Sequence, residues 1–426
     1  ESRLDDITAE SEVRRELERL DPAAGAVLFR LLPKGQALRI FEGLDPSHQQ
    51  ELLAGLRDEQ AAQVVAHLDP DDRARLLDEM PAGLARRLLR GLSPEERRMT
   101  ATLLGYPEDS VGRVMSPEVL RLEEDMTVAE ALEKVRRRGA TAETVYLLPV
   151  TDEERALVGV AELAELVVAD PGDRVGAHLD PESPRVRAHV DREGAARRLQ
   201  EARALALPVV DAEDRLVGVL TVDDAMAVLE AEESEDILRG GGAEPLRRPY
   251  LTSSAMRLAR SRAVWLLALI VAATLTVNVL QAFEGTLEEV ITLALFIPLL
   301  IDTGGNAGAQ ASTTIVRALA LGDVRVGDAL RVAGREARVG LLLGAMLAAL
   351  GFLPVSAVYG ADIATVVSLT LVSVVCLAST VGALLPLAAQ RLRVDPAIMS
   401  APIVTTLIDA TGLLIYFLIA TAVLGL

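Results

Sequence analysis

The strongest constraint on the fold is a set of long apolar segments in residues 257–426. Each segment is close to the length that crosses a bilayer as a helix. We therefore predict five spans, at about 262–283, 287–302, 339–359, 363–390 and 401–425. Ten arginines lie at one side of the predicted spans, and the loops at the other side hold neither arginine nor lysine. This asymmetry predicts that the arginine-bearing side is cytosolic, which places the C-terminus outside.

The net charge is confined to the N-terminal part. Residues 257–426 contain ten acidic residues and ten arginines, so the formal charge of −19 belongs to residues 1–256. Such acidity repels nucleic acid and attracts cations, although simple solubility explains it equally well. The single cysteine, Cys376, excludes disulfides and thiolate metal sites, and no apolar signal segment is expected near the N-terminus.

A short motif recurs every 24 residues in the first hundred. It reads Leu-Asp-Pro three times and Leu-Ser-Pro once, with the prolines at 22, 46, 70 and 94. Asp or Ser before proline is typical of a helix N-cap followed by a first turn that tolerates proline. Leu32-Pro33 and Met80-Pro81 mark midpoints where further short helices are expected to begin. The pattern predicts a stacked helical array.

From about residue 110, short β-branched runs alternate with helical segments, and the same unit occurs twice. Leu-Pro-Val at 148–150 and 207–209, and Val-Gly-Val at 158–160 and 217–219, occupy similar places in the two copies. With Val114-Met115-Ser116-Pro117 as the opening, the region resembles a tandem CBS-domain pair.

The fifth predicted span contains one carboxylate, Asp409, with threonines such as Thr405 near it. Burying this charge costs at least about 2.5–3.5 kcal/mol on insertion scales. Residues 263–316, 339–390 and 394–426 contain no lysine, arginine or histidine that could pair with it. An ion, water or protonation must therefore meet the charge, which indicates a functional role.

The second span continues into a glycine-rich stretch with Gly304, Gly305, Asn306 and Gln310. We predict an irregular backbone here, whose free carbonyls line a cavity. Carbonyl, amide and carboxylate oxygens without sulfur or imidazole suit a hard cation such as Mg2+. The alternative is an ordinary helix in which small residues allow close packing.

These motifs together carry a family resemblance. Thr303-Gly304-Gly305-Asn306-Ala307-Gly308-Ala309-Gln310, then Arg317-Ala318-Leu319-Ala320, and Ala401-Pro402 with Asp409-Ala410-Thr411-Gly412, resemble the MgtE family of Mg2+ channels. The resemblance covers essentially the whole chain. It implies a multidomain membrane protein with an all-α superhelical N domain, an α/β CBS pair and a polytopic α-helical membrane domain with five spans. The corresponding boundaries are 1–107, 108–230, a connecting plug helix at 231–256, and a transmembrane pore domain at 257–426.

The resemblance also implies a homodimer in the bacterial inner membrane, with a pore lined by the second and fifth spans. Mg2+ would pass down the membrane potential past Asp409, Thr405, Asn306, Gly304 and Gly305. Cytosolic Mg2+ would close the pore by binding acidic residues of the soluble part. The candidates are Asp71, Asp191, Glu193, Asp224, Glu232, Glu235, Asp236 and Asp395. Other acids of the family's sensor fall here on Arg39, Arg75, Arg203 and Ala227, so salt bridges are expected to replace some of the ions.

A nucleotide site is a further hypothesis. Gly218, Thr221 and Asp224 fit a pattern by which some CBS copies bind the adenosine ribose, so ATP is a candidate regulator; the first copy lacks the matching Thr and Asp.

Other functions stay open at this point. They are a cation-coupled secondary transporter of another divalent metal and a non-conducting CBS-containing membrane sensor. An enzyme is disfavoured because the four histidines are scattered through the soluble part and no phosphate-binding loop is present. Asp302 either attracts cations to the pore or only marks the end of a span.

Overall fold

The computed structural model describes residues 2–245, 250, 253–399 and 401–426. It divides into two compact units. We refer to residues 1–232 with 247–252 as the N-terminal unit, and to residues 233–246 with 253–426 as the membrane unit. Part of the predicted connecting segment, 246–249 and 251–252, lies outside the described residues.

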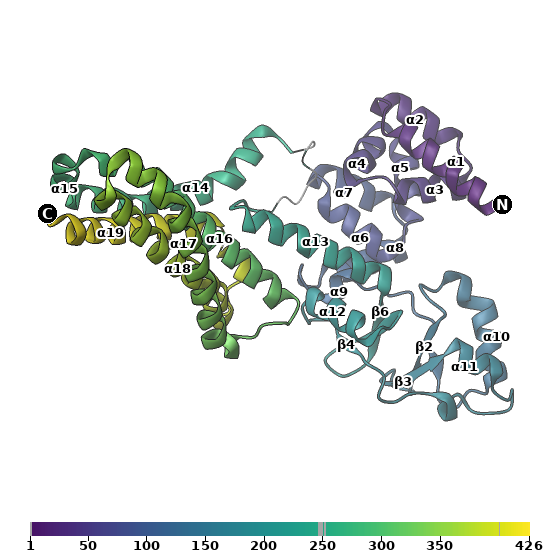
Figure 1. The fold of residues 1–426 in the computed structure, drawn as a ribbon. Coiled ribbons are helices and arrows are strands. Elements are labelled where there is room, and N and C mark those ends of the chain that lie inside the picture. Colours follow the sequence, from purple (N-terminus) through teal and green to yellow (C-terminus); the bar gives the residue numbers. More distant parts are fainter. Residues whose placement is uncertain (1, 246–249, 251–252, 400) are drawn as a thin grey trace. The chain divides into compact units, whose positions relative to one another are not determined.

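The N-terminal unit begins with the predicted helical array (Figure 1). Its helices are α1 (Ser2–Leu17), α2 (Pro22–Leu31), α3 (Lys34–Glu42), α4 (Pro46–Gly55), α5 (Asp58–Ala66), α6 (Pro70–Glu79), α7 (Ala82–Gly91) and α8 (Pro94–Leu104). The even-numbered helices each begin at the proline of the repeat, as predicted. Asp21, Asp45 and Ser93 accept hydrogen bonds from the backbone of the turn that follows them. At Asp69 no such side-chain bond forms.

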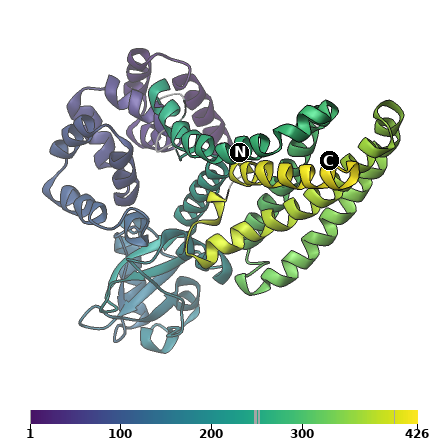
Figure 2. The same cartoon turned by 90° about the vertical axis from the view of Figure 1, so that its left-hand side faces the viewer.

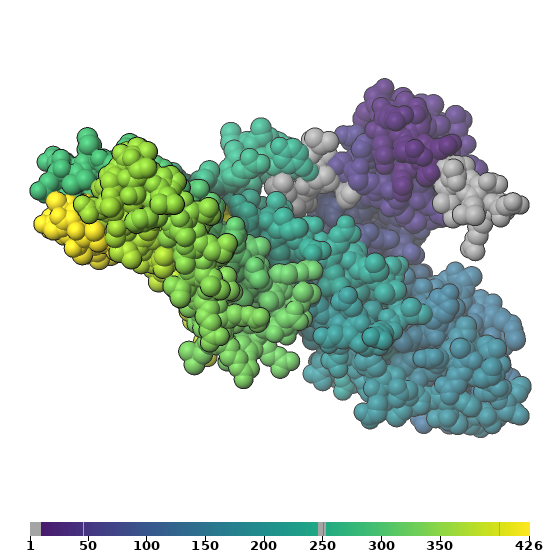
Figure 3. Space-filling model, viewed as in Figure 1, coloured from purple at the N-terminus to yellow at the C-terminus, as the bar shows by residue number. Residues whose placement is uncertain are grey.

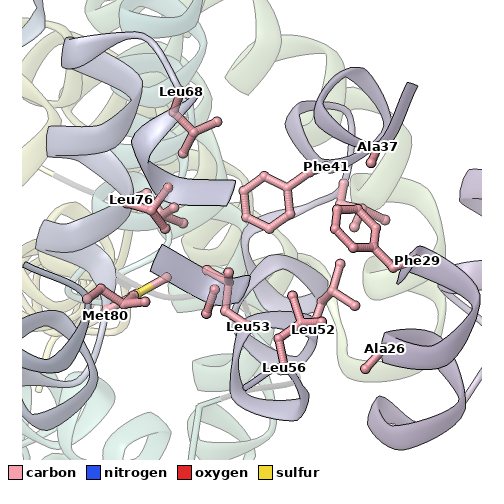
Figure 4. Close-up of a cluster of buried hydrophobic side chains, with 14 of the residues drawn as sticks. Ala26, Phe29, Ala37, Phe41, Leu52, Leu53, Leu56, Leu68, Leu76 and Met80 are labelled. Carbon is pink, nitrogen blue, oxygen red and sulfur yellow. The ribbon is translucent and has the colours of Figure 1, made fainter. Parts of the chain in front are cut away.

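The apolar seam of this array is continuous through α2 to α7. Figure 4 shows Phe29 and Phe41 side by side, and their ring centroids lie 6.3 Å apart in an edge-on arrangement. Leu52 and Leu53 of α4, together with Leu76 of α6, belong to the same buried cluster. These leucines therefore form contacts between the stacked helices.

Two small sheets follow, one in each copy of the repeated α/β unit. The strands are β1 (Leu122–Glu123), β2 (Leu147–Thr151), β3 (Leu157–Glu162), β4 (Val186–Arg187), β5 (Ala206–Val210) and β6 (Leu216–Thr221). The helices are α9 (Val111–Val114), α10 (Val128–Arg138), α11 (Leu163–Val168), α12 (Arg192–Ala202) and α13 (Val222–Gly240). The strand orders are β1-β2-β3 and β4-β5-β6. In both sheets the first pair is parallel and the second antiparallel, which confirms the predicted duplication.

Among its described residues, the membrane unit contains five helices that are long and apolar enough to cross a membrane, as predicted. It consists of α14 (Ala255–Ala282), α15 (Glu284–Glu289), α16 (Ile297–Ala320), α17 (Ala329–Tyr359), α18 (Ala361–Arg391) and α19 (Ala401–Leu424). The second and third candidate spans, Ile291–Ala320 and Val326–Tyr359, are longer than predicted. The second span is extended by the glycine-rich stretch of α16, and the third by the arginine-bearing beginning of α17.

Within the membrane unit, α18 is central and α14 is peripheral. Fifteen residues of α18 are buried, whereas none of α14 is. The long helices α17 and α18 lie side by side in both ribbon views (Figures 1 and 2). They form an antiparallel pair, because Gly340 approaches Cys376 and Gly344 approaches Val372. In the space-filling view α17, in green, covers much of the visible face of this unit (Figure 3).

Candidate ion pathway and regulatory sites

The glycine-rich stretch is part of a regular helix. α16 runs without a break from Ile297 to Ala320, so the predicted irregular backbone is wrong. A Cβ on Gly304 would lie 2.5 Å from Val374 Cγ1, and one on Gly305 would lie 2.7 Å from Thr405 Cγ2. The glycines therefore permit α16 to pack closely against α18 and α19, which was the alternative interpretation. Their carbonyls are used within the helix and are not free to face a cavity.

Close contacts fix the register between α16 and α19. Gly304 meets Ile408, and Gly308 meets Val404. One turn further along α16, Ser312 Oγ donates a hydrogen bond of 2.8 Å to the carbonyl of Met399. Because the partner number falls as the α16 number rises, the helices run antiparallel. This register places Asp302 at the level of Asp409, and Asn306 at the level of Thr405.

The carboxylate of Asp409 is partly buried in α19. Its Oδ1 is buried and accepts no hydrogen bond from any described residue. The charged group that acts on it electrostatically is another acid, Asp302. A buried carboxylate beside a second carboxylate is unfavourable unless a cation or water compensates the charge.

The polar groups of α16 form a stripe that the chain itself does not cover. Asp302, Asn306 and Gln310 are exposed and follow one another at a spacing of four residues, which places them along one face of the helix. On α19, Thr406 and Thr411 donate their hydroxyls to backbone carbonyls one turn earlier. No such bond joins Thr405 to a described residue. Asp302, Asn306, Thr405 and Asp409 thus supply oxygen atoms at adjoining levels of two packed helices.

A second pair of acids lies in the N-terminal unit. Asp71 of α6 is only 7% exposed, and its Oδ1 accepts no hydrogen bond from a described residue. Burial, together with the neighbouring carboxylate of Asp224 in α13, raises the pKa of Asp71 to about 9. Burial also raises the pKa of Asp224 to about 6. Two of the predicted regulatory residues are thus brought together from segments that are far apart in sequence.

Further acids contribute to this cluster that the sequence analysis did not single out. Burial raises the pKa of Glu143 to about 7, and Asp69, Asp224 and Asp223 act on it as neighbouring charges. Burial likewise raises the pKa of Glu42 to about 7, with Asp72 and Asp69 as neighbours. Nothing in their local sequence distinguishes these two glutamates from surface acids, because only the fold brings them to the same place.

Most other predicted regulatory acids are already engaged by the protein. Asp191 caps α12 by accepting from the backbone of Gly194, and Glu193 pairs with Arg197 at 2.6 Å. The remaining partners are Arg192 for Glu232, and Arg239 for both Glu235 and Asp395. Asp236 also has an interaction within the chain. Among the described residues, no group of three or more His, Cys, Asp or Glu side chains is arranged to hold a metal.

The predicted nucleotide residues lie at the end of β6 and the start of α13. Thr221 donates its hydroxyl to Asp224 Oδ2 at 2.6 Å. A Cβ on Gly218 would lie 2.8 Å from the carbonyl oxygen of Ser116, so only glycine permits this close approach of β6 to the segment that contains Ser116. Thr221 and Asp224 are therefore adjacent, as a ribose site requires, but they satisfy each other.

Comparisons with known proteins decide the family. A family profile described as a divalent cation transporter, MgtE, matches residues 297–419. The MgtE intracellular N domain matches residues 9–109, and the CBS domain matches 111–172 and 180–231. The Magnesium transporter MgtE of Thermus thermophilus is 44% identical over 331 residues, which is 77% of this chain and 73% of that protein. This chain belongs to the MgtE family. Its fold class and family were both predicted correctly.

Other MgtE proteins are more distant. Those of Enterococcus faecalis and Bacillus subtilis are each 31% identical, over 75% and 77% of this chain and 70% and 72% of their own lengths. Among solved structures, the cytosolic domain of the Mg2+ channel MgtE in complex with ATP is 36% identical and covers 51% of this chain and 90% of that one, with a TM-score of 0.49.

Arg39, Arg75 and Arg203, the arginines that the sequence analysis placed at positions of sensor acids, have two kinds of role in this structure. Arg39 pairs with Glu10 through Nε at 3.0 Å, and Arg75 pairs with Asp72. Arg203 instead ends α12 in the left-handed conformation, with φ 52°. Two of the substituted positions therefore form salt bridges, as expected, and Arg203 has a role in the backbone.

Proposed function

We propose that this protein conducts Mg2+ passively through a pore lined by α16 and α19, and that Asp409 is the acid that binds the passing ion. The unpaired carboxylate of Asp409 in an apolar span is the observation that carries this proposal. The polar stripe on α16 supports it, since amide and carboxylate oxygens at adjoining levels suit a hydrated hard cation. Thr405, Asn306 and Asp302 are assigned to the same path, with Gly304 and Gly305 permitting the helices to approach.

We place the pore at the axis of a homodimer in the bacterial inner membrane. The polar stripe is exposed on a single chain, so a second copy is needed to enclose it. The arginines near the ends of α14, α16 and α17 support a cytosolic N-terminal part and an external C-terminus. Lipid surrounds the remaining apolar surface. We keep the domain boundaries that the resemblance implies, which are 1–107, 108–230, 231–256 and 257–426.

Regulation by cytosolic Mg2+ is proposed at the Asp71 and Asp224 pair. These acids are buried and repel each other, so a divalent ion between them would stabilise the contact of α6 with α13. Metal binding would then favour one arrangement of the N-terminal unit. Glu143 is the further acid with which this ion would interact. ATP is proposed as a second regulator, through Thr221 and Asp224 of the CBS copy that retains both residues.

Mg2+ flux into proteoliposomes tests the ion path. We expect flux in the wild type, a loss of at least about 100-fold in Asp409→Asn, and no loss in Asp323→Asn. Asp323 is a matched control, because its exposed side chain lies in the loop after α16. Detergent chromatography checks that all three proteins are folded.

The alternatives predict other outcomes. Flux that needs a proton or sodium gradient would indicate a coupled transporter. Absence of wild-type flux at low internal Mg2+ would contradict conduction and favour a membrane sensor.

A further inference from the structure

Within the membrane unit, the end of α13 and the residues after it lie against the long apolar helices. Glu233 pairs with Arg317 of α16, with 3.3 Å between Oε1 and Nη1. A Cβ on Gly242, whose φ is +71°, would lie 3.1 Å from Pro402 in the first turn of α19. The backbone N–H of Glu244 donates to the carbonyl of Ser261 in α14. We call residues 233–245 the docking segment.

Arg239 is the central contact of the docking segment. Its Nη1 donates a hydrogen bond to Asp395 Oδ2, and its Nη2 pairs with Glu235 Oε1. All three side chains are about 70% shielded from solvent. Burial alone would lower the pKa of Arg239, but Glu235 and Asp395 raise it, so the guanidinium stays charged. A planar guanidinium that bridges two carboxylates is a strong and directional contact.

Asp395 connects this bridge to the proposed pore. Its other oxygen, Oδ1, accepts a hydrogen bond of 2.9 Å from the backbone of Ala397 and so begins the short turn Pro396–Ile398. The next residue, Met399, accepts the hydrogen bond from Ser312 of α16. Arg239 therefore holds the turn that links the start of α19 to α16, and both oxygens of Asp395 are occupied.

We propose that Arg239 is a built-in cation that docks residues 233–245 onto the end of α16 and α19 without a metal ion. Glu235 and Asp395 are then not an open divalent site, and the Mg2+ dependence of regulation resides in the N-terminal unit. At low cytosolic Mg2+ the docking segment stays on the end of the pore helices. The regulatory consequence rests on the proposed ion path, whereas the docking itself does not.

The contrast with Asp71 supports this division. Asp71 is buried with an unsatisfied oxygen and with acids as its neighbours, so either protonation or a bound cation is needed to compensate its charge. At Glu235 and Asp395 the cation is already part of the chain. A divalent ion at this second place would have to displace a guanidinium that is held by two carboxylates.

Hydrogen–deuterium exchange of the full-length protein in EDTA tests the docking, because it needs no conduction. The variants are Arg239→Gln, Asp395→Asn and Arg239→Lys, and asparagine at 395 keeps the ability to cap the turn. Arg257→Gln is the control, since Arg257 is exposed in the same unit and pairs with no acid in the described part of the chain. In wild type we expect amides 235–244 to be protected without Mg2+. Glutamine at 239 and asparagine at 395 should each speed their exchange about tenfold, with lysine intermediate.

Several outcomes decide the proposal. A double variant, Arg239→Gln with Asp395→Asn, should exchange no faster than either single variant, since both remove the same contact. Protection that returns in Arg239→Gln only when Mg2+ is added would support it, because the freed carboxylates would then take up a metal. Wild-type protection that appears only with Mg2+, or unchanged exchange in Arg239→Gln, would overturn it. Absence of Mg2+ flux in the wild type, with exchange as expected in all variants, would count against the proposed ion path and leave the docking intact.

Discussion

Two charged side chains, Arg73 in the N-terminal unit and Asp409 in the membrane unit, have contrasting environments. Arg73 in the helical array is 4% exposed, and its Nε and Nη2 donate to the carbonyls of Val65, Ala66 and Leu68 at 2.7–3.1 Å. Asp409 in the membrane unit has a buried oxygen with no partner among the described residues. The guanidinium of Arg73 bonds the free carbonyls at the end of a helix, whereas the carboxylate of Asp409 is left for an exchangeable ligand such as an ion or water.

The helical array repeats one side-chain hydrogen bond at the same 24-residue period as its sequence. Gln49, Arg73 and Arg97 are 24 residues apart, and they donate to the carbonyls of Phe41, Val65 and Leu89, which are also 24 apart. Each side chain therefore satisfies carbonyls at the end of the preceding helix. A polar group that recurs with the repeat is structural. Asp409 has no counterpart at such a period.

Replacing Arg73 should give the largest change in stability. Arg73→Met leaves three carbonyls without a donor in a buried place, so we expect a loss of about 3 kcal/mol in the free energy of unfolding of the helical array. Arg97→Met is the matched control at the next repeat. Because Arg97 is exposed and water can replace it, its loss should cost only about 1 kcal/mol.

Hydrogen–deuterium exchange of the α5 and α7 amides in the full chain, at increasing urea concentration, measures the loss in the free energy of unfolding for each variant. Equal losses in the two variants would contradict the view that burial makes Arg73 structural.

A glycine change tests whether the membrane unit depends on packing instead. A Cβ on Gly382 of α18 would lie 2.2 Å from the carbonyl oxygen of Gly308 in α16, and a backbone atom cannot rotate away. Gly382→Ala should therefore cost about 2 kcal/mol by separating the two helices. Gly351→Ala on α17, where nothing lies within 4 Å, should be neutral or slightly stabilising.

Thermal unfolding in detergent distinguishes these variants. If Gly382→Ala unfolded at the wild-type temperature, the close contact of α16 with α18 would not hold the unit together.

The features that the sequence predicted are those with local signals. Caps before proline mark the helix starts at Pro22, Pro46, Pro70 and Pro94, and hydropathy marks five spans. The glycines at 304, 305 and 308 were misinterpreted, because a glycine that breaks a helix and one that lets a helix pack closely have the same local sequence. Only the facing side chains, such as Thr405 and Val374, distinguish the two cases.

The candidate sites were predicted only in part, because some of their residues carry a signal in the sequence and others meet only through the fold. Asp409 was evident because its span lacks any cation, and that is a property of sequence. The bridge of Arg239 to Asp395 joins residues 156 positions apart, and the cluster around Asp71 includes Glu143 only through the fold. Tertiary contacts of this kind leave no periodic or local pattern.

The stability of the N-terminal unit should depend on pH, because the unit buries the acid pair Asp71 and Asp224. A raised pKa in the folded state means that folding favours the protonated acid, so stability is highest at low pH. It should fall as the pH rises from about 4, the ordinary Asp value, through about 6 for Asp224 and onward toward 9 for Asp71. In EDTA we expect the unit to be at least about 1–2 kcal/mol less stable at pH 8 than at pH 5.5.

Thermal unfolding of the full chain at both pH values measures this difference. Asp71→Asn should remove most of it, and Mg2+ should stabilise the wild type more at pH 8 than at pH 5.5. The exposed Glu182→Gln serves as the control. Greater stability at pH 8 in EDTA would contradict the buried acid pair.

The smallest effect concerns Asp302, which sharpens the contrast between a structural and a functional charge. It is exposed at the level of Asp409 and acts on it electrostatically, so it should attract the same ion through water. Asp302→Asn should raise the Mg2+ concentration for half-maximal flux about fivefold, which corresponds to about 1 kcal/mol, and leave the maximal flux unchanged. The shift should shrink at high ionic strength, since water-exposed charges are screened. A loss of maximal flux, as expected for Asp409→Asn, would mean that Asp302 contacts the ion directly, and no shift at low salt would mean that it does not act on the ion. The expectation that Asp302 marks the end of a span is wrong, because the second candidate span runs from Ile291 to Ala320.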